Sequence, residues 1–320
     1  MFSNDLSLWL NMLTIAVLTF ALANGAVSVV VASLAQQFLT IQVRSRKTVL
    51  WMLAILPWFA SLCVTLCFIY KFYTTSPFDK SFDFAHWHHM ASFNWQSWHG
   101  ITLMIAAIIF TYVISSKLWQ LRKHSKELAL LTDLSQPIAD NVYKIEAPYA
   151  SAFTSGFTHK RCFVTDNLLA QTSQREQAII IAHEQAHAKH SDPLKKWLFS
   201  ILAAFFIPTI GKRLKLHMTL AMEQDADNAV ISDKLDSTAV ASTLVKVAHL
   251  NAQQTPICHN ELVANFGAQV LEQRVYFLLG QLKLNPANKY VTTALIIATL
   301  LLCLSSIDAL HHFIETVFSH

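Results

Sequence analysis

Two histidines four residues apart, with a glutamate directly after the first, stand in the segment 183–187. In a helix, residues i and i+4 project from one face, so the imidazoles of His183 and His187 can bind the same metal ion. Glu184 lies one position further along, where its carboxylate can take a proton from a water molecule on that ion. The alternative, three polar residues on a solvated helix face, is disfavoured because an apolar run precedes them at 178–182. The spacing therefore predicts a zinc site with Glu184 as general base.

A catalytic zinc ion has three protein ligands and keeps one position open for water. The best candidate for the third ligand is Glu223, in the acidic stretch 222–227. Asp227 lies four residues later on the same helix face, where it can accept the free N–H of a ligand histidine and fix its tautomer. A solvated acidic turn is the alternative for this stretch. We expect one zinc ion per chain, bound by His183, His187 and Glu223.

Weaker candidates for substrate or transition-state contacts lie outside these two motifs. Residues 160–165 alternate with β-branched and aromatic side chains, which is compatible with an edge strand that pairs with a substrate backbone. Such a strand would place Phe163 and Val164 beside the substrate, but an inner strand of a sheet fits the pattern equally well. His217 and Tyr276 are the candidates for a second group that stabilises the transition state.

The helix that carries the two histidines is expected at 175–190, since Pro193 disfavours a helical residue before it. The chain around it is 53% hydrophobic and only 14% charged, whereas an average soluble domain has about 25% charged residues. No Asp, Glu, Lys or Arg occurs from Leu6 to Val43, and roughly 20 apolar residues already cross a bilayer. A wholly soluble protein and a disordered one are therefore excluded. The net charge of +4 is too small to indicate nucleic acid binding.

Four apolar segments predict membrane-spanning helices, at residues 8–34, 49–70, 99–116 and 290–307. The first three form an anchor at 1–116, with an outer loop rich in His and Trp at 71–98. Residues 117–289 carry most of the charged side chains and form the expected peptidase domain, and 290–320 add the last span and a short outer tail. The expected fold is a mainly α integral membrane protein with a cytoplasmic α+β peptidase domain.

The orientation follows from the loops, because Lys and Arg accumulate on the cytoplasmic side. The basic residues concerned are Arg44, Arg46 and Lys47 after the first span, and Lys117, Arg122, Lys123 and Lys126 after the third. This pattern places the peptidase domain in the cytoplasm and both termini outside.

The apolar segment 197–211 lies between His187 and Glu223. A single crossing there would put the two ligands on opposite sides of the membrane. Two crossings do not fit, because each needs about 20 residues. The segment is therefore expected to be an interfacial or re-entrant helix, or core of the peptidase domain. Flanking cations at 195, 196, 212 and 213 favour a helix lying against the inner leaflet.

Histidines also gather near the outer loop, at His86, His88, His89 and His99. They could bind a metal ion and so form a sensor. The alternative is an interfacial belt, in which these rings and the neighbouring tryptophans lie at the level of the lipid headgroups.

The segment 183–194, HEQAHAKHSDPL, followed by EQDAD at 223–227, resembles the membrane gluzincin metallopeptidases. Within them it is most similar to the beta-lactam sensor-transducer (antirepressor) peptidases. Residues 156–169, GFTHKRCFVTDNLL, and 271–279, around Arg274, agree with this resemblance, which covers residues 151–280. The chain ends 13 residues after Ile307, so we expect no penicillin-binding sensor domain and no sensing by acylation.

The resemblance implies a zinc endopeptidase of the bacterial cytoplasmic membrane that, on a signal, removes a transcriptional repressor or cleaves itself. By matching position it assigns His183, His187 and Glu223 as ligands, Glu184 as base and Asp227 as their neighbouring carboxylate. The implied partners are the lipid bilayer and a cytoplasmic repressor, without direct nucleic acid contact, and a homodimer stays open.

Two alternatives remain. A housekeeping quality-control protease of the heat-shock type shares the motifs but usually places two spans between them. A non-catalytic membrane sensor could retain the zinc site. The second is disfavoured because two histidines and a glutamate form an open, water-bearing ligand set.

Overall fold

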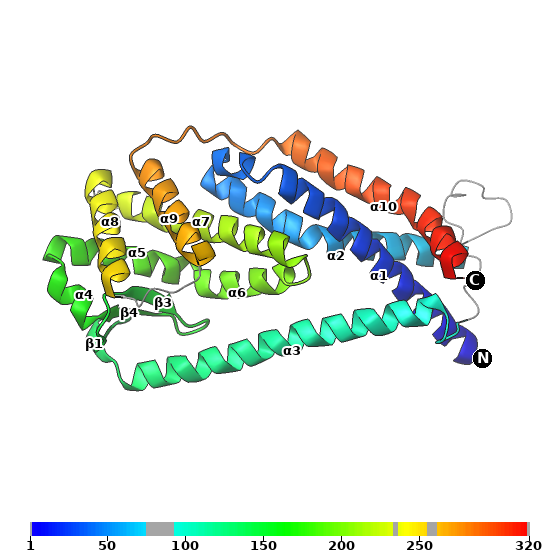
Figure 1. Ribbon diagram of the computed structural model, residues 1–320, viewed down its shortest axis with the longest axis horizontal. Helices are drawn as coiled ribbons and strands as arrows, with labels where there is room; N and C mark the ends of the chain where they lie inside the picture. The colour runs from blue at the N-terminus through cyan, green and yellow to red at the C-terminus, as the bar shows by residue number, and fades with distance from the viewer. Residues whose placement is uncertain (1, 75–92, 233–235, 255–260, 319–320) are drawn as a thin grey trace.

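The computed structural model describes residues 2–74, 93–232, 236–254 and 261–318. Four of its helices are long and apolar enough to cross a membrane: α1 (Phe2–Ser33), α2 (Val43–Thr74), α3 (Trp98–Asp133) and α10 (Lys289–Phe318). Both termini lie at the end of the bundle remote from the sheet (Figure 1). This architecture confirms the predicted mainly α membrane protein with four spans and a small sheet-containing domain.

Helix α3 extends far beyond its apolar part. Its 36 residues correspond to about 54 Å at 1.5 Å per residue, whereas a hydrocarbon core is only about 30 Å thick. The second half of α3 runs past the bundle and ends at the sheet (Figure 1). The proposed domain boundary at 116/117 therefore falls inside one continuous helix.

The sheet has four short strands in the order β1-β2-β4-β3. The strands are β1 (Gln136–Ala139), β2 (Val142–Ile145), β3 (Ala152–Ser155) and β4 (Arg161–Thr165). β4 pairs with β2 in parallel and with β3 antiparallel, so the edge-strand interpretation of residues 160–165 is wrong. Phe163 is buried between the rings of Tyr143 and Phe153, at 5.8 and 5.4 Å, and Val164 is in the core. The free edge near the site belongs to β3.

Six helices of the described residues complete the region around the sheet. They are α4 (Asp166–Gln171), α5 (Gln174–His190), α6 (Asp192–Ala203), α7 (Pro208–Ser232), α8 (Ser237–Gln254) and α9 (Glu261–Leu278). The short 3-10 helix η1 (Gln37–Thr40) connects α1 to α2. The sheet and α5 share one core, which includes Val142, Cys162, Leu168 and Ile180.

The segment 197–211 is divided between α6, a turn and the start of α7, so it is not the single interfacial helix that the flanking cations favoured over a re-entrant helix or a core segment. Its apolar side chains, Phe199, Ala203, Phe206 and Ile210, join one core with residues of α1 and α2. In the turn, the Phe205 ring lies 5.0 Å from the ring of Trp58, and the Phe205 carbonyl accepts a hydrogen bond from Asn24 Nδ2 at 3.0 Å. The α6–α7 hairpin therefore connects the region around the sheet to the apolar helices α1 and α2. Its depth in a bilayer stays a prediction.

Candidate metal centre

Local sequence defines both ends of α5. At its start, Ser173 and Glu176 form a capping box, in which each side chain accepts a hydrogen bond from the other's backbone N–H. At its end, Ser191 adopts a left-handed conformation with φ 57°, which stops the helix and turns the chain into α6. Ile179 and Ile180 are buried, and this packing fixes the rotation of α5. The helix thereby presents both histidines and Glu184 to one cavity.

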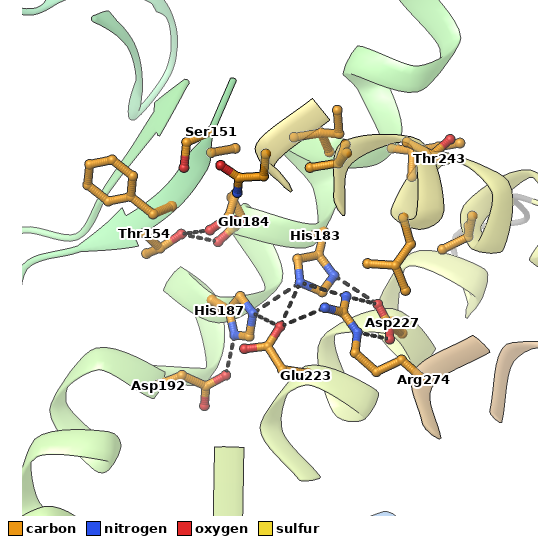
Figure 2. Close-up of a pocket in the computed structure, with 18 of the residues that line it drawn as sticks. Ser151, Thr154, His183, Glu184, His187, Asp192, Glu223, Asp227, Thr243 and Arg274 are labelled. Atoms are coloured by element: carbon orange, nitrogen blue, oxygen red, sulfur yellow. Dashed lines mark hydrogen bonds and ion pairs between the residues drawn. The ribbon is translucent and has the colours of Figure 1, made fainter. Parts of the chain in front are cut away.

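Three donor atoms from α5 and α7 form a nearly equilateral triangle (Figure 2). His183 Nε2 lies 3.1 Å from His187 Nε2 and 3.3 Å from Glu223 Oε2, and His187 Nε2 lies 3.4 Å from the same oxygen. Ligands of tetrahedral zinc at about 2.0–2.1 Å from the ion are separated from one another by about 3.3 Å. The observed triangle therefore fits one zinc ion with a fourth position open.

The other nitrogen of each histidine faces a carboxylate. His183 Nδ1 lies 3.1 Å from Asp227 Oδ1, and His187 Nδ1 lies 2.7 Å from Asp192 Oδ2. When the Nδ1–H of a neutral imidazole donates a hydrogen bond to a carboxylate, the lone pair is on Nε2 and can bind a metal ion. The sequence predicts the contact of Asp227 with a ligand histidine but not that of Asp192. The available signal was an acid placed directly after a helix that ends in histidine and lysine.

Two cations lie against these carboxylates. Arg274 of α9 donates to both oxygens of Asp227, at 2.7 and 2.8 Å, and its Nη1 lies 3.3 Å from Glu223 Oε2. Lys196 of α6 donates to Glu223 Oε1 at 3.0 Å. The sequence analysis placed Lys196 among the cations that flank 197–211 and Arg274 in the family resemblance, but it predicted no contact of either residue with the metal-ligand candidates.

The pKa values of the cluster indicate a site that attracts positive charge. Burial alone would raise the pKa of Glu223, but hydrogen bonds with His183 and His187 and the charge of Lys196 hold it well below its ordinary value. Burial alone would lower the pKa of His187, but its hydrogen bonds with Asp192 and Glu223 raise it to about 9. The Glu223 carboxylate thus stays ionised and favours positive charge at the imidazoles, whether a proton or a bound metal ion carries it.

Glu184 is held beside the triangle by the edge strand. Thr154 of β3 lies with its Oγ1 2.8 Å from Glu184 Oε2 and 2.7 Å from the Glu184 backbone carbonyl. The hydroxyl has one proton, so these two oxygens share one donor. Figure 2 shows Thr154 and Glu184 on the side of the histidines away from Asp227 and Arg274. Glu184 is therefore placed to exchange a proton with a group at the open position.

A cavity of about 330 Å³ contains all of these groups. One wall is the β3 edge, from Ser151 to Thr154. The wall formed by α5 and α8 is mostly apolar, and its members are Ile179, Ile180, Val240, Leu244 and Val247. An edge strand beside an apolar wall suits an extended peptide with an apolar side chain.

The structure does not bring His217 or Tyr276 into this cavity. His217 is buried on α7 with its ring 5.3 Å from that of Phe38. Burial, together with the charges of Arg46 and Arg213, lowers the pKa of His217 to about 4. Tyr276 is 38% exposed. Phe163 and Val164 lie inside the sheet and also do not line the cavity.

Of the outer histidines, His86, His88 and His89 lie outside the described residues. The His99 ring stacks on that of Trp98 at 3.7 Å and lies 5.7 Å from that of His311. Within the described part of the chain, the group of three or more metal-binding side chains is His183, His187 and Glu223.

Comparison with known proteins gives results that agree with this centre. The chain is 35% identical over 82 residues to a protein named Protease HtpX homolog from Helicobacter acinonychis (strain Sheeba). It is 34% identical over 82 residues to the protein of the same name from Helicobacter pylori (strain Shi470). Each match covers 25% of this chain and 26% of the relative, so the matched part spans about a quarter of either protein. Residues 117–260 match the model of peptidase family M48, and this segment, which holds the three donor residues, is therefore similar to a family of zinc metallopeptidases.

Proposed function

We propose that this chain is a membrane-embedded, zinc-dependent endopeptidase. The observation that carries the proposal is the triangle of donor atoms, 3.1–3.4 Å on each side, with the Glu184 carboxylate beside it in the same cavity. The match of residues 117–260 to peptidase family M48 supports it independently of the geometry.

His183, His187 and Glu223 are the residues that would hold the zinc ion. When bound, zinc polarises a carbonyl and lowers the pKa of a water molecule toward about 7. Glu184 accepts a proton from the attacking water and returns it to the leaving amine. Thr154 keeps the Glu184 carboxylate in place through its hydrogen bond. Asp192 and Asp227 hold the two imidazoles so that their Nε2 atoms form the donor triangle with Glu223.

The substrate is proposed to bind in extended form along β3. Main-chain hydrogen bonds to an exposed strand edge give affinity without sequence preference. The apolar wall between α5 and α8 then selects a large apolar side chain beside the scissile bond. A peptide library in which this position varies would measure that preference.

The test of the reaction is Glu184→Gln in the purified full-length protein in detergent, assayed on a quenched fluorescent peptide. Loss of a general base is expected to lower kcat by about 10²–10⁴-fold. Zinc affinity should stay near the wild-type value, because Glu184 is not a ligand. Equal peptide cleavage by both proteins would exclude hydrolysis at this centre and leave a non-catalytic sensor.

For the biological substrate, we propose a cytoplasmic transcriptional repressor, cleaved in response to a signal, with self-cleavage as part of activation. The resemblance of the zinc motifs to antirepressor peptidases supports this choice. The chain would be co-expressed with the repressor encoded beside it, as wild type and as Glu184→Ala. Repressor that disappears equally with both proteins would contradict the proposal.

Quality control of membrane proteins is the second candidate, favoured by the similarity to proteins named Protease HtpX homolog. The α6–α7 hairpin between the two motifs stands against it, since the quality-control type usually has two spans there. A destabilised membrane protein that accumulates with Glu184→Ala, while the repressor level does not change, would favour this function.

A further inference from the structure

Arg46, near the start of α2, is a fully buried arginine beside the ligand-bearing turn of α7. Its side chain is 0% exposed. Nη1 donates to Gln224 Oε1 at 3.0 Å, and Nη2 donates to the carbonyls of Leu39 and Ile41 at 3.2 and 2.9 Å. All these acceptors are uncharged, and within the described residues Arg46 forms no ion pair. The guanidinium therefore has hydrogen bonds but no carboxylate that would offset its burial.

Gln224 follows the third ligand, Glu223, directly in α7. It is also 0% exposed, and its amide Nε2 donates to the backbone carbonyl of Gln273 at 3.3 Å. Gln273 precedes Arg274, whose guanidinium contacts Asp227 and Glu223. One side chain, Gln224, thus connects α2 to α9 at the turn from which Glu223 projects.

The backbone that Arg46 holds is the connection between α1 and α2. Ile41 forms a bridge with Asn285, Gln42 N–H donates to the Asn285 carbonyl at 2.8 Å, and Asn285 N–H donates to the Thr40 carbonyl at 2.9 Å. Residue 285 precedes α10 in the chain. The α1–α2 connection, the start of α2 and the segment before α10 are therefore linked beside Arg46, and Arg46 contacts α7 at Gln224.

The contact between Arg46 and Gln224 does more than fill space in the core. A buried polar pair is seldom more stabilising than apolar side chains of the same volume, but its directional hydrogen bonds fix one rotation of a helix. The donor triangle requires that rotation, because Glu223 Oε2 lies 3.3 and 3.4 Å from two nitrogens of another helix. A shift of about 1 Å would open the ligand set.

We propose that Arg46 and Gln224 are positioning residues for Glu223, and that they couple the α1–α2 connection to the metal centre. The inference rests on the proposed zinc site. It implies that a movement of the membrane helices at this connection changes zinc affinity and ligand geometry.

The experiment compares full-length wild type with Arg46→Met, Gln224→Leu and the double variant. Arg44→Met is the matched control, because it removes a cation from the same first turns of α2 but from an exposed side chain. Zinc affinity would be measured by competition with a chelator, and ligand geometry by the visible absorption of the Co²⁺-loaded protein. A single substitution leaves one buried polar side chain without its partner and can prevent folding. The double variant removes both partners together, so it can be measured even where a single variant does not fold.

Residues that support metal ligands typically contribute about 10–100-fold to affinity, so each folded single variant should bind zinc at least tenfold more weakly and show a changed Co²⁺ spectrum. The double variant should resemble the single variants, and Arg44→Met should resemble wild type. A folded double variant with wild-type zinc affinity and Co²⁺ spectrum would overturn the inference. If Glu223→Gln bound zinc as tightly as wild type does, the proposed zinc site itself would be overturned. The two failures are therefore distinct.

Discussion

His187 Nδ1 and Asp192 Oδ2 are 2.7 Å apart, although they belong to different helices. The left-handed conformation of Ser191 makes the contact possible, since it ends α5 and starts α6 at Asp192. Lys160 Nζ donates to the Ser191 hydroxyl at 2.7 Å and so connects this corner to the sheet. The junction between the two helices is thus part of the candidate metal centre.

Asp192→Ala is expected to weaken zinc binding by about 10–100-fold, because the His187 imidazole loses the acceptor that fixes its tautomer. Asp192→Asn keeps a neutral acceptor and should fall between wild type and Asp192→Ala. Competition with a chelator measures both affinities. Asp140→Ala, at an exposed turn between β1 and β2, is the control. Zinc affinity of Asp192→Ala equal to that of this control would contradict the role.

Thr154→Val removes the hydroxyl that holds Glu184 and keeps the shape of the side chain. A hydrogen bond to a charged group is worth about 1.5–3 kcal/mol, so kcat should fall at least tenfold. Zinc affinity should not change, because Thr154 does not contact the three ligands. Steady-state kinetics on the fluorescent peptide gives kcat, and Thr154→Ser, which keeps the hydroxyl, should retain most of it. A similar loss of kcat in both variants would indicate a packing effect.

His217 makes stability depend on pH. Its pKa is about 4 in the folded protein, where burial and the charges of Arg46 and Arg213 disfavour the proton, against an ordinary value of 6.5. The unfolded state therefore binds the proton first as pH falls. The stability is complete above pH 6.5 and decreases toward pH 4, by up to ~3 kcal/mol.

His217→Leu should remove this dependence. Between pH 7 and pH 5, the Tm of wild type in detergent should decrease more steeply than that of the variant. Parallel decreases of the two Tm values would show that other groups cause the acid sensitivity. The same substitution tests the structural position of His217 against Phe38, outside the cavity.

The group of three candidate ligands could be predicted from sequence because the pattern is local. His183 and His187 are one helical turn apart, and Glu223 and Asp227 repeat that spacing in a second helix. Four long apolar runs likewise predict spans without knowledge of their neighbours. The supporting residues could not be found this way. Asp192 depends on one left-handed residue, Arg274 on the packing of α9, and Thr154 on which strand forms the edge.

Strand order and the α6–α7 hairpin also required the structure. Alternation at 160–165 is the same for an edge strand and an inner strand, and only the pairing of β4 with β2 and β3 distinguishes them. Residues 197–211 read as one apolar run, yet Pro208 starts a new helix within it. The apolar residues of the run are buried against α1 and α2. No local sequence pattern predicts these contacts.

The orientation of the chain in the membrane gives the last prediction. The start of α2, which carries Arg44 and Lys47, and the extension of α3, which carries Lys117 and Lys126, lie toward the sheet end of the bundle (Figure 1). Both termini lie at the other end (Figure 1). Because Lys and Arg stay on the cytoplasmic side, an epitope after His320 should be removed by protease added to intact spheroplasts. An epitope in the β1–β2 turn at Asp140 should be protected until the cells are lysed. The reverse pattern would place the peptidase domain outside and exclude a cytoplasmic repressor as its substrate, whereas the zinc chemistry would be unaffected.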